Sequence, residues 1–277
     1  MKKLHAISGN TQWLDGGSMF GNAPKALWEK WIPADERNRI HLATRALLFQ
    51  TGSKNILFEA GIGAFFEPKL KERYGVAENE HMLLQNLGNF GLQEKDINAV
   101  VLSHLHFDHA GGLLSAYTSE RAPHLLFPNA RYYVGKRHWE RALNPHLRER
   151  ASFIPLLHKL LGESDRLMLI EDSFHEDLED IRFHFSDGHT VGLMLSEIAD
   201  ENGDLVVFAS DLVPGVPWIH LPITMGYDRY PELLVDEKRK LLEYVSEKGG
   251  SLFFTHDLET VKVQVAYDKA SDRYSNK

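Results

Sequence analysis

The stretch His104-Leu105-His106-Phe107-Asp108-His109 holds four side chains that can bind a metal within six residues. It directly follows the apolar run 98–102, which is typical of a buried strand, and it precedes Ala110-Gly111-Gly112. Residues spaced i, i+2, i+4 and i+5 do not share one face of a helix, whereas a tight loop can bring them together. The stretch therefore predicts a metal site in a loop at the carboxyl end of a strand.

Three more side chains of the same kind follow predicted strands further along the chain. His189, Asp211 and His256 each lie just beyond an apolar run. Parallel neighbouring strands deliver such side chains to one edge of a sheet, where open α/β sheets place their sites. Seven ligands exceed the four that one zinc ion takes, so the set suits two ions that share a carboxylate. Imidazole and carboxylate donors without thiolate fit zinc, manganese, iron or cobalt.

Composition narrows the class of protein. The 277 residues include no cysteine, which excludes disulfides, thiolate nucleophiles and cysteine-based metal sites. The formal charge of −8 disfavours a nonspecific nucleic-acid binder. No apolar run approaches the roughly 20 residues that span a bilayer, so no membrane association is expected. Polar residues follow Met1-Lys2-Lys3 in place of an apolar signal region, and we expect a cytoplasmic protein.

Strand runs occur both before and after helices along the chain. This pattern of apolar residues predicts an α/β protein in which helices and sheets form separate layers, an α+β layered arrangement. A long helix over 231–248 begins with Pro231 and ends before Gly249. Strands are expected at 45–49, 55–58, 98–102, 130–134, 167–170, 181–185, 191–198, 205–209, 251–254 and 261–267, and helices at 81–88, 112–116, 137–143 and 152–161.

The N-terminal segment 15–40 is rich in turn residues yet carries large apolar side chains, among them Trp28 and Trp31. Such side chains need cover from the body of the protein, a partner subunit or a ligand. We expect an extended arm here, attached to a single domain that spans residues 1–277.

The series His104–His109, His189, Asp211 and His256 resembles the motif series of the metallo-β-lactamase superfamily. That resemblance implies an αββα sandwich in which helices flank two mixed β-sheets. It implies that one metal is held by His104, His106 and His189, the other by Asp108, His109 and His256, and that Asp211 bridges them. We expect two divalent ions, zinc first, with manganese, iron or cobalt as alternatives.

A closer resemblance is to the YtnP-type quorum-quenching lactonases, which are similar to the N-acyl-homoserine lactonases. It rests on the segments Asp15-Gly-Gly-Ser-Met-Phe-Gly21, Pro24-Lys-Ala-Leu-Trp28, His106-Phe-Asp-His-Ala110, Ser186-Asp-Gly-His189, Asp211-Leu-Val-Pro214 and Tyr227-Asp-Arg-Tyr-Pro231. Two positions depart from the pattern of relatives. Glu59 stands where many have an aspartate beside a metal-binding histidine, and Pro214 stands where some homoserine lactonases have a tyrosine. Tyr227 is a candidate substitute for that phenol.

The implied reaction is the opening of a lactone ring, N-acyl-homoserine lactone first, by a metal-bound hydroxide. Asp108 is then both a ligand and the catalytic residue that passes a proton to the leaving oxygen. An aryl esterase or phosphotriesterase of the methyl parathion hydrolase type is the first alternative. A noncatalytic metal or ligand sensor on the same fold is the second.

Five residues are candidates for contact with a small-molecule ester or lactone, and most are apolar, which suits an acyl chain. Of the ten histidines outside the motif series, only His220 is expected to touch substrate, because it follows the proline-rich run after Asp211. A homodimer is expected, with no nucleic-acid partner. The substrate candidates are Met19, Phe20, Trp218, His220 and Tyr227.

Overall fold

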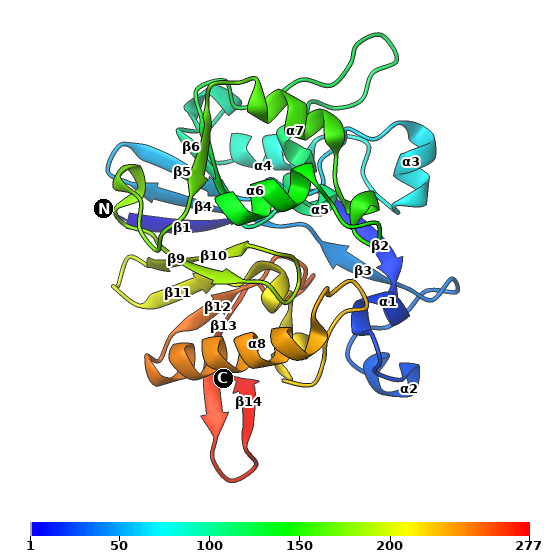
Figure 1. The fold of residues 1–277 in the computed structure, drawn as a ribbon, viewed down its shortest axis with the longest axis vertical. Coiled ribbons are helices and arrows are strands. Elements are labelled where there is room, and N and C mark those ends of the chain that lie inside the picture. Colours follow the sequence, from blue (N-terminus) through cyan, green and yellow to red (C-terminus); the bar gives the residue numbers. More distant parts are fainter. Residues whose placement is uncertain (1) are drawn as a thin grey trace. The chain divides into compact units, whose positions relative to one another are not determined.

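The computed structural model describes residues 2–277, which divide into two compact units (Figure 1). Unit 1 contains the described residues up to 12 together with 43–171, and unit 2 contains 13–42 together with 172–277. Each unit has a six-stranded mixed sheet and a hydrophobic core of its own. The mixed sheets with helices beside them confirm the predicted combination of layers.

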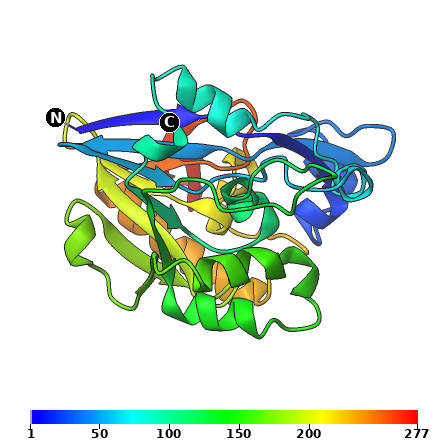
Figure 2. The ribbon, with the colours of Figure 1, turned by 90° about the horizontal axis from the view of Figure 1, so that it is seen from above.

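The sheet of unit 1 turns from antiparallel to parallel along its order β1-β4-β5-β6-β7-β8. Strands β1 and β4 lie side by side as antiparallel neighbours (Figure 2), whereas β5, β6, β7 and β8 are parallel. The four parallel strands therefore end at one edge. The strands are β1 (Lys2–Ile7), β4 (Ala46–Thr51), β5 (Lys54–Phe58), β6 (Ala99–Leu102), β7 (Arg131–Gly135) and β8 (Leu167–Ile170).

Short helices complete unit 1. Their apolar residues recur at helical spacing, as Leu83 and Leu87 or Leu157 and Leu161 do, and pack into the same core as the sheet. The helices are α3 (Pro68–Arg73), α4 (Met82–Gly88), α5 (Phe107–Ala110), α6 (Lys136–Leu143) and α7 (Pro155–Gly162), with 3-10 turns at Glu94–Asp96, Gly111–Leu113 and Arg150–Ser152.

The sheet of unit 2 has the order β14-β13-β12-β11-β10-β9. Strand β10 is antiparallel to both neighbours, and β11 is parallel to β12, so β9, β11 and β12 run in the same direction. The strands are β9 (Arg182–Ser186), β10 (Leu193–Ala199), β11 (Leu205–Phe208), β12 (Ser251–Phe253), β13 (Lys262–Asp268) and β14 (Arg273–Asn276), with 3-10 turns at Glu176–Leu178, Ser210–Leu212 and Val216–Ile219.

The helix α8 (Pro231–Glu247) lies along this sheet, against β12 and β13 (Figure 1). Pro231 occupies its first turn, and Gly249 ends it with φ of 63°, a left-handed conformation that favours glycine. The side chain of Lys238 is fully buried on this helix. Its Nζ donates to the carbonyl oxygens of His220 (3.1 Å) and Ile223 (2.6 Å), so α8 holds the loop that follows Ile219.

The predicted elements are largely confirmed, with boundaries that shift by at most three residues. The helix expected over 112–116 is wrong: a 3-10 turn over Gly111–Leu113 ends there, and Leu114 then pairs with Leu125 in an isolated bridge. The prediction missed the strands β1 and β14 and the pair β2 (Thr11–Asp15) and β3 (Arg39–Ala43). β1, β2 and β14 carry many polar residues, whereas β3 alternates between polar and apolar residues and offered a signal that the prediction did not use.

The segment expected to be an extended arm forms two short helices, α1 (Gly16–Phe20) and α2 (Lys25–Trp28). Asp15 caps α1 by accepting a hydrogen bond from the amide of Ser18 at 2.7 Å. The ring of Phe20 stacks between those of Trp28 and Trp218, with centroids 5.4 and 4.7 Å away. The core of unit 2 therefore supplies cover for these apolar side chains, and the extended conformation is not observed.

No helix within residues 2–277 is long and apolar enough to cross a membrane. The expectation of one domain over the whole chain stays a prediction, because a single domain can contain two compact units.

We expect Lys238 to make the free energy of unfolding depend on pH in the alkaline range. Burial lowers the pKa of Lys238 from 10.5 to about 7, although the nearby Asp228 opposes the shift. The unfolded chain then binds more protons than the folded chain between pH 7 and 10.5, so the free energy of unfolding rises with pH in that window, by up to roughly 1.4 kcal/mol per unit. Below pH 7 both states are protonated, and this dependence disappears.

Urea unfolding at pH 7, 8 and 9 checks this dependence. In Lys238→Met the rise should shrink, whereas in Lys240→Met, an exposed lysine on the same helix, it should stay. Equal slopes in the wild type and Lys238→Met would show that Lys238 does not titrate in this range.

Candidate metal centre

Strand β6 leads directly into the histidine-rich stretch of unit 1. The chain stays extended through His106, and α5 then turns once, with the amide of His109 donating to the carbonyl of His106 at 3.1 Å. All four predicted ligands of this stretch are buried, and His104 and His109 are fully so. The loop therefore brings together the side chains that a helix would separate.

These four side chains form two pairs inside unit 1. The rings of His104 and His106 have centroids 4.5 Å apart, and their nearest ligand nitrogens lie within 4.8 Å. The Nε2 atom of His109 lies 3.8 Å from Oδ1 of Asp108. Each pair offers two donor atoms to one ion.

Glu59 holds one histidine of each pair from behind. Its Oε2 accepts a hydrogen bond from Nδ1 of His109 at 2.9 Å, and its Oε1 accepts one from the hydroxyl of Ser103. The Oγ atom of Ser103 lies 2.8 Å from Nδ1 of His104. Both imidazoles therefore carry the proton on Nδ1 and present Nε2 as a donor atom. Glu59, His104 and His109 also have ligand atoms within 4.8 Å of one another, but these contacts assign Glu59 to the supporting role.

The backbone of Glu59 supports this role at a cost. Its φ of 62° lies in the left-handed region, which is uncommon for residues other than glycine. Strain of this kind persists where the surroundings fix it, often at functional sites. Here the end of β5 turns so that a longer side chain reaches the imidazoles, and Glu59 takes the place that the sequence resemblance assigns to an aspartate.

The other two ligands of unit 1 also have supporting contacts. Nε2 of His106 lies 3.3 Å from Oε1 of the buried Glu149, whose Oε2 accepts from Nε of Arg141 at 2.7 Å. The side-chain amide of Gln12 donates to Oδ2 of Asp108 at 2.9 Å. We expect a metal to bind through Nδ1 of His106 and Oδ1 of Asp108, because Nε2 of His106 and Oδ2 of Asp108 make these contacts.

Unit 2 brings its three predicted ligands to one sheet edge, because β9, β11 and β12 end there. Oδ2 of Asp211 lies 3.2 Å from Nε2 of His189, and Oδ1 lies 3.1 Å from Nε2 of His256. All three side chains are buried. One carboxylate thus faces two different imidazoles, one with each oxygen.

Asp228 orients His189 in the same way as Glu59 orients His109. Its Oδ1 accepts from Nδ1 of His189 at 2.8 Å, and its Oδ2 accepts from the amide of Met225 at 2.6 Å. The neighbouring loop is fixed by Glu237 of α8, which accepts hydrogen bonds from Ser186, Asp187 and Gly188.

The donor set fits divalent metal ions. Buried carboxylates beside imidazoles that already donate through their other nitrogen need a positive charge for compensation. Imidazole nitrogen and carboxylate oxygen are the ligands of zinc, manganese, iron and cobalt. In unit 1 the donors form the two pairs described above. In unit 2 one oxygen of Asp211 lies beside His189 and the other beside His256, which suits a carboxylate shared by two ions.

Three of the five substrate candidates are buried in the core of unit 2, and two are not. Met19, Phe20 and Trp218 are each at most 2% exposed, and the indole of Trp218 donates to the carbonyl of Met19. His220 stacks on Trp31, and Tyr227 is exposed. Burial, first, and then the charges of Arg273 and Lys238 lower the pKa of His220. Contact of the five with substrate stays a prediction.

The sequence analysis missed the supporting residues Gln12, Glu149 and Asp228. Asp228 had a usable signal, since it lies in the segment Tyr227–Pro231 that carries the closer resemblance. Gln12 and Glu149 lie 96 and 43 residues from the ligands that they contact, and no local pattern marks them.

Comparison with known proteins gives the family. Residues 41–256 match the metallo-beta-lactamase superfamily, a span that includes all seven predicted ligands. The chain belongs to this superfamily. As a metallo-beta-lactamase superfamily member it is a metal-dependent hydrolase, and it has the fold of that family.

Relatives within the superfamily include lactonases. The chain is 26% identical over 211 residues to an N-acyl homoserine lactonase of Bacillus thuringiensis, covering 72% of this chain and 70% of the relative. It is 24% identical over 248 residues to an N-acyl homoserine lactonase of Bacillus cereus, covering 81% and 85%.

Two solved structures match the whole chain. A "probable metal-dependent hydrolase" from Staphylococcus aureus is 31% identical, with a TM-score of 0.88, and the match covers 100% of this chain and 97% of that one. AidC, a dizinc quorum-quenching lactonase in complex with its product, is 20% identical, with a TM-score of 0.74 and coverage of 100% and 94%. The second likeness supports the fold alone.

We expect Glu59→Gln to weaken metal binding in unit 1. The amide has one accepting oxygen where the carboxylate has two, so it cannot accept from both Ser103 and His109, and at least one imidazole loses its orientation. Loss of such supporting contacts lowers metal affinity by about 10- to 100-fold. Competition with a chromophoric chelator measures the affinity. Glu171→Gln removes an exposed carboxylate of the same unit and should change nothing. Unaltered affinity in Glu59→Gln would contradict the supporting role.

Proposed function

We propose that the protein is a dinuclear hydrolase that opens the ring of N-acyl-homoserine lactones. The observation that carries the two-metal part is the position of Asp211, which faces His189 with one oxygen and His256 with the other. The lactone part is supported by the lactonase relatives in Bacillus species. The seven-residue series in family order supports the assignment of ligands.

The proposal assigns the ligands as the sequence resemblance implies. His104, His106 and His189 would hold one ion, and Asp108, His109 and His256 the other. Asp211 would contribute one oxygen to each. Two divalent ions, when bound, would lower the pKa of a water molecule and polarise the carbonyl group of an ester. We place zinc first among the candidate ions.

The chain's own residues then orient the site and move protons. In lactone hydrolysis, water adds to the carbonyl carbon, the ring C–O bond breaks, and the leaving oxygen takes up a proton. Asp108 is the proposed carrier of that proton, and the side-chain amide of Gln12 holds its Oδ2 in place. Glu59, Glu149 and Asp228 keep the histidines oriented without touching substrate.

The protein is further proposed to be a cytoplasmic homodimer that acts on small molecules and binds neither nucleic acid nor membrane. The charge of −8 supports the exclusion of nucleic acid. Sedimentation velocity at micromolar concentration tests the oligomeric state.

Metal analysis tests the ligand assignment. Elemental analysis should give two ions per chain, and His109→Ala and His189→Ala should each lose one. Asp211→Ala should lose affinity for both, because its carboxylate is shared. Glu171→Gln, which changes an exposed carboxylate and leaves every ligand in place, serves as the control. A stoichiometry near one that is unaffected by His109→Ala and His256→Ala would exclude the dinuclear centre.

A pH-indicator screen of the metal-loaded enzyme tests the reaction. We expect hydrolysis of N-acyl-homoserine lactones, a loss of activity after chelation, and recovery when zinc, manganese or cobalt is added. Asp108→Asn should lower kcat/KM by about 100-fold or more if it carries the proton. Efficient cleavage of phosphotriesters or aryl esters with no lactone opening would replace the lactonase assignment by the esterase alternative. No turnover of any ester would favour the sensor.

A further inference from the structure

His138 lies outside the predicted ligand set, and its side chain is fully buried in unit 1. It belongs to α6, the helix that begins where β7 ends. Its Nε2 accepts a hydrogen bond from the backbone amide of Leu105 at 2.8 Å. Leu105 is the residue between the predicted ligands His104 and His106, so this contact holds the backbone of the histidine-rich stretch itself.

The sheet of unit 1 supports β6 only as far as Leu102. Beyond that point the next pairing along the chain is an isolated bridge between His106 and Phe153. An extended chain places residues two apart on the same side, which agrees with the 4.5 Å between the ring centroids of His104 and His106. Their spacing therefore depends on the two peptide groups between them, and His138 fixes one of these.

The contact also determines which nitrogen of His138 carries the proton. A backbone amide can only donate, so Nε2 is the unprotonated nitrogen and the neutral ring carries its proton on Nδ1. Leu105 is itself fully buried, so water does not replace the acceptor if His138 is lost. A buried amide without an acceptor is costly, and the chain would shift to find another one.

Helix α6 makes a second connection to the same pair of ligands. Arg141 lies three residues after His138, and residues at this spacing share one face of a helix. Nε of Arg141 donates to Oε2 of Glu149 at 2.7 Å, and Oε1 of Glu149 lies 3.3 Å from Nε2 of His106. One helix therefore supports both the backbone between the two ligands and the ring of the second ligand.

Ring contacts restrict the movement of His138. Its ring centroid lies 5.9 Å from that of His104 and 6.5 Å from that of His106, edge to face in both cases. Phe153 packs against both His106 and His138, with centroids 5.0 and 5.9 Å away. The accepting nitrogen is therefore held in place by packing.

We propose that His138 is a positioning residue that sets the spacing of His104 and His106 by holding a peptide group between them. It acts through Leu105 and touches neither metal nor substrate. Its effect is confined to the ion that these two ligands share, and the other ion keeps its affinity. The assignment of ligands to two ions rests on the proposed function, whereas the contact with Leu105 does not.

Three substitutions at this position separate hydrogen bonding from packing. In His138→Gln the amide oxygen can reach the place of Nε2, whereas the shorter side chain of His138→Asn reaches only the place of Nδ1. His138→Leu keeps apolar volume without an acceptor. Competition with a chromophoric chelator should show zinc affinity about 10- to 100-fold lower in His138→Leu and His138→Asn, and within about threefold of the wild type in His138→Gln.

The visible absorption of the cobalt-loaded protein is a second readout, because the coordination geometry of cobalt depends on its ligands. The spectrum should change in His138→Leu and return in His138→Gln. Circular dichroism of the metal-free variants identifies any that does not fold. If His138→Leu does not fold, the comparison of His138→Gln with His138→Asn decides.

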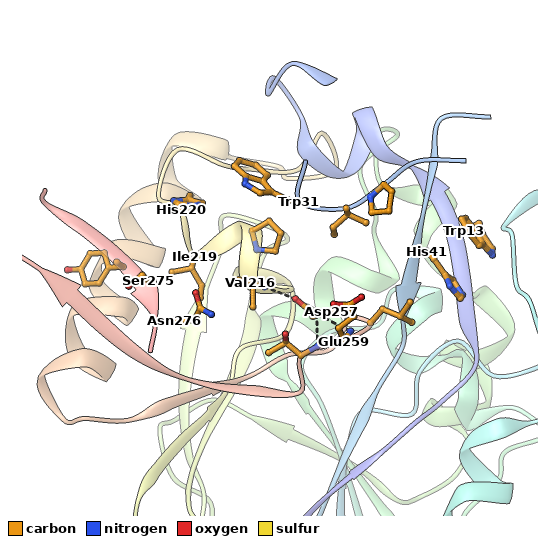
Figure 3. Close-up of a pocket in the computed structure, with 16 residues that line it drawn as sticks. Trp13, Trp31, His41, Val216, Ile219, His220, Asp257, Glu259, Ser275 and Asn276 are labelled. Carbon is orange, nitrogen blue, oxygen red and sulfur yellow. Dashed lines mark hydrogen bonds between the residues drawn. The ribbon is translucent and has the colours of Figure 1, made fainter. Parts of the chain in front are cut away.

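The control histidine lines a cavity of about 450 Å³ in unit 2 (Figure 3). Trp13 stacks on His41 with ring centroids 4.5 Å apart, and Trp31 stacks on His220 at 5.5 Å. Figure 3 shows the two pairs on separate sides of the cavity. None of the supporting contacts described above involves His41. His41→Leu therefore removes a partly buried imidazole and should leave the zinc affinity and the cobalt spectrum unchanged.

Double variants assign the effect to one ion. His189→Ala removes a ligand of the ion proposed to bind His104 and His106, and in that background His138→Leu should cause no further loss. His256→Ala removes a ligand of the other ion, and there His138→Leu should still weaken binding. Unchanged affinity in His138→Leu, equal losses in His138→Leu and His138→Gln, or a further loss in the His189→Ala background overturns the proposal.

The outcome is separate from that of the proposed function. If the protein binds one ion or opens no lactone, rescue of metal affinity by His138→Gln still supports the positioning role. If two ions bind and lactones are opened, but His138→Gln loses as much affinity as His138→Leu, the proposed function stands and His138 only fills space.

Discussion

The carboxylate of Asp211, buried and facing an imidazole nitrogen with each oxygen, is the interaction on which the arrangement of unit 2 depends. A carboxylate in such a place is stable only where positive charge and hydrogen-bond donors converge on it. Three strands that run in one direction supply the converging chain ends. Helix α8 then fixes the loops that carry the imidazoles, through Glu237 and the buried Lys238.

Unit 1 also contains a buried carboxylate that supports two imidazoles, that of Glu59, but this residue holds the predicted ligands in place and is not one of them. One oxygen of Glu59 accepts from Nδ1 of His109, and the other accepts from the hydroxyl of Ser103, which in turn contacts Nδ1 of His104. One buried carboxylate therefore couples His104 and His109, which belong to different pairs. The left-handed backbone at Glu59 shows that the chain accepts local strain to keep this coupling.

Much of this could be predicted from the sequence, and the limits have physical causes. Buried strands such as β6 are continuous apolar runs, and ligand types at strand ends are visible as residues, so the histidine-rich loop and the order of the ligands could be inferred. The supporting contacts of Gln12 and Glu149 depend on tertiary packing over long separations, which no local pattern encodes. The segment 16–28 misled for a related reason: its turn residues suggest an open chain, but Asp15 caps a helix and Phe20 packs between two tryptophans.

The walls of the unit 2 cavity and the donor atoms for metal come from different side chains. Trp13, Trp31 and His41 project from the N-terminal segment, whereas His189, Asp211 and His256 follow strands of the sheet. Exchange of a wall residue changes the shape of the cavity and removes no donor atom. Substitutions in the N-terminal segment can therefore change the shape of this cavity while the predicted metal ligands stay in place.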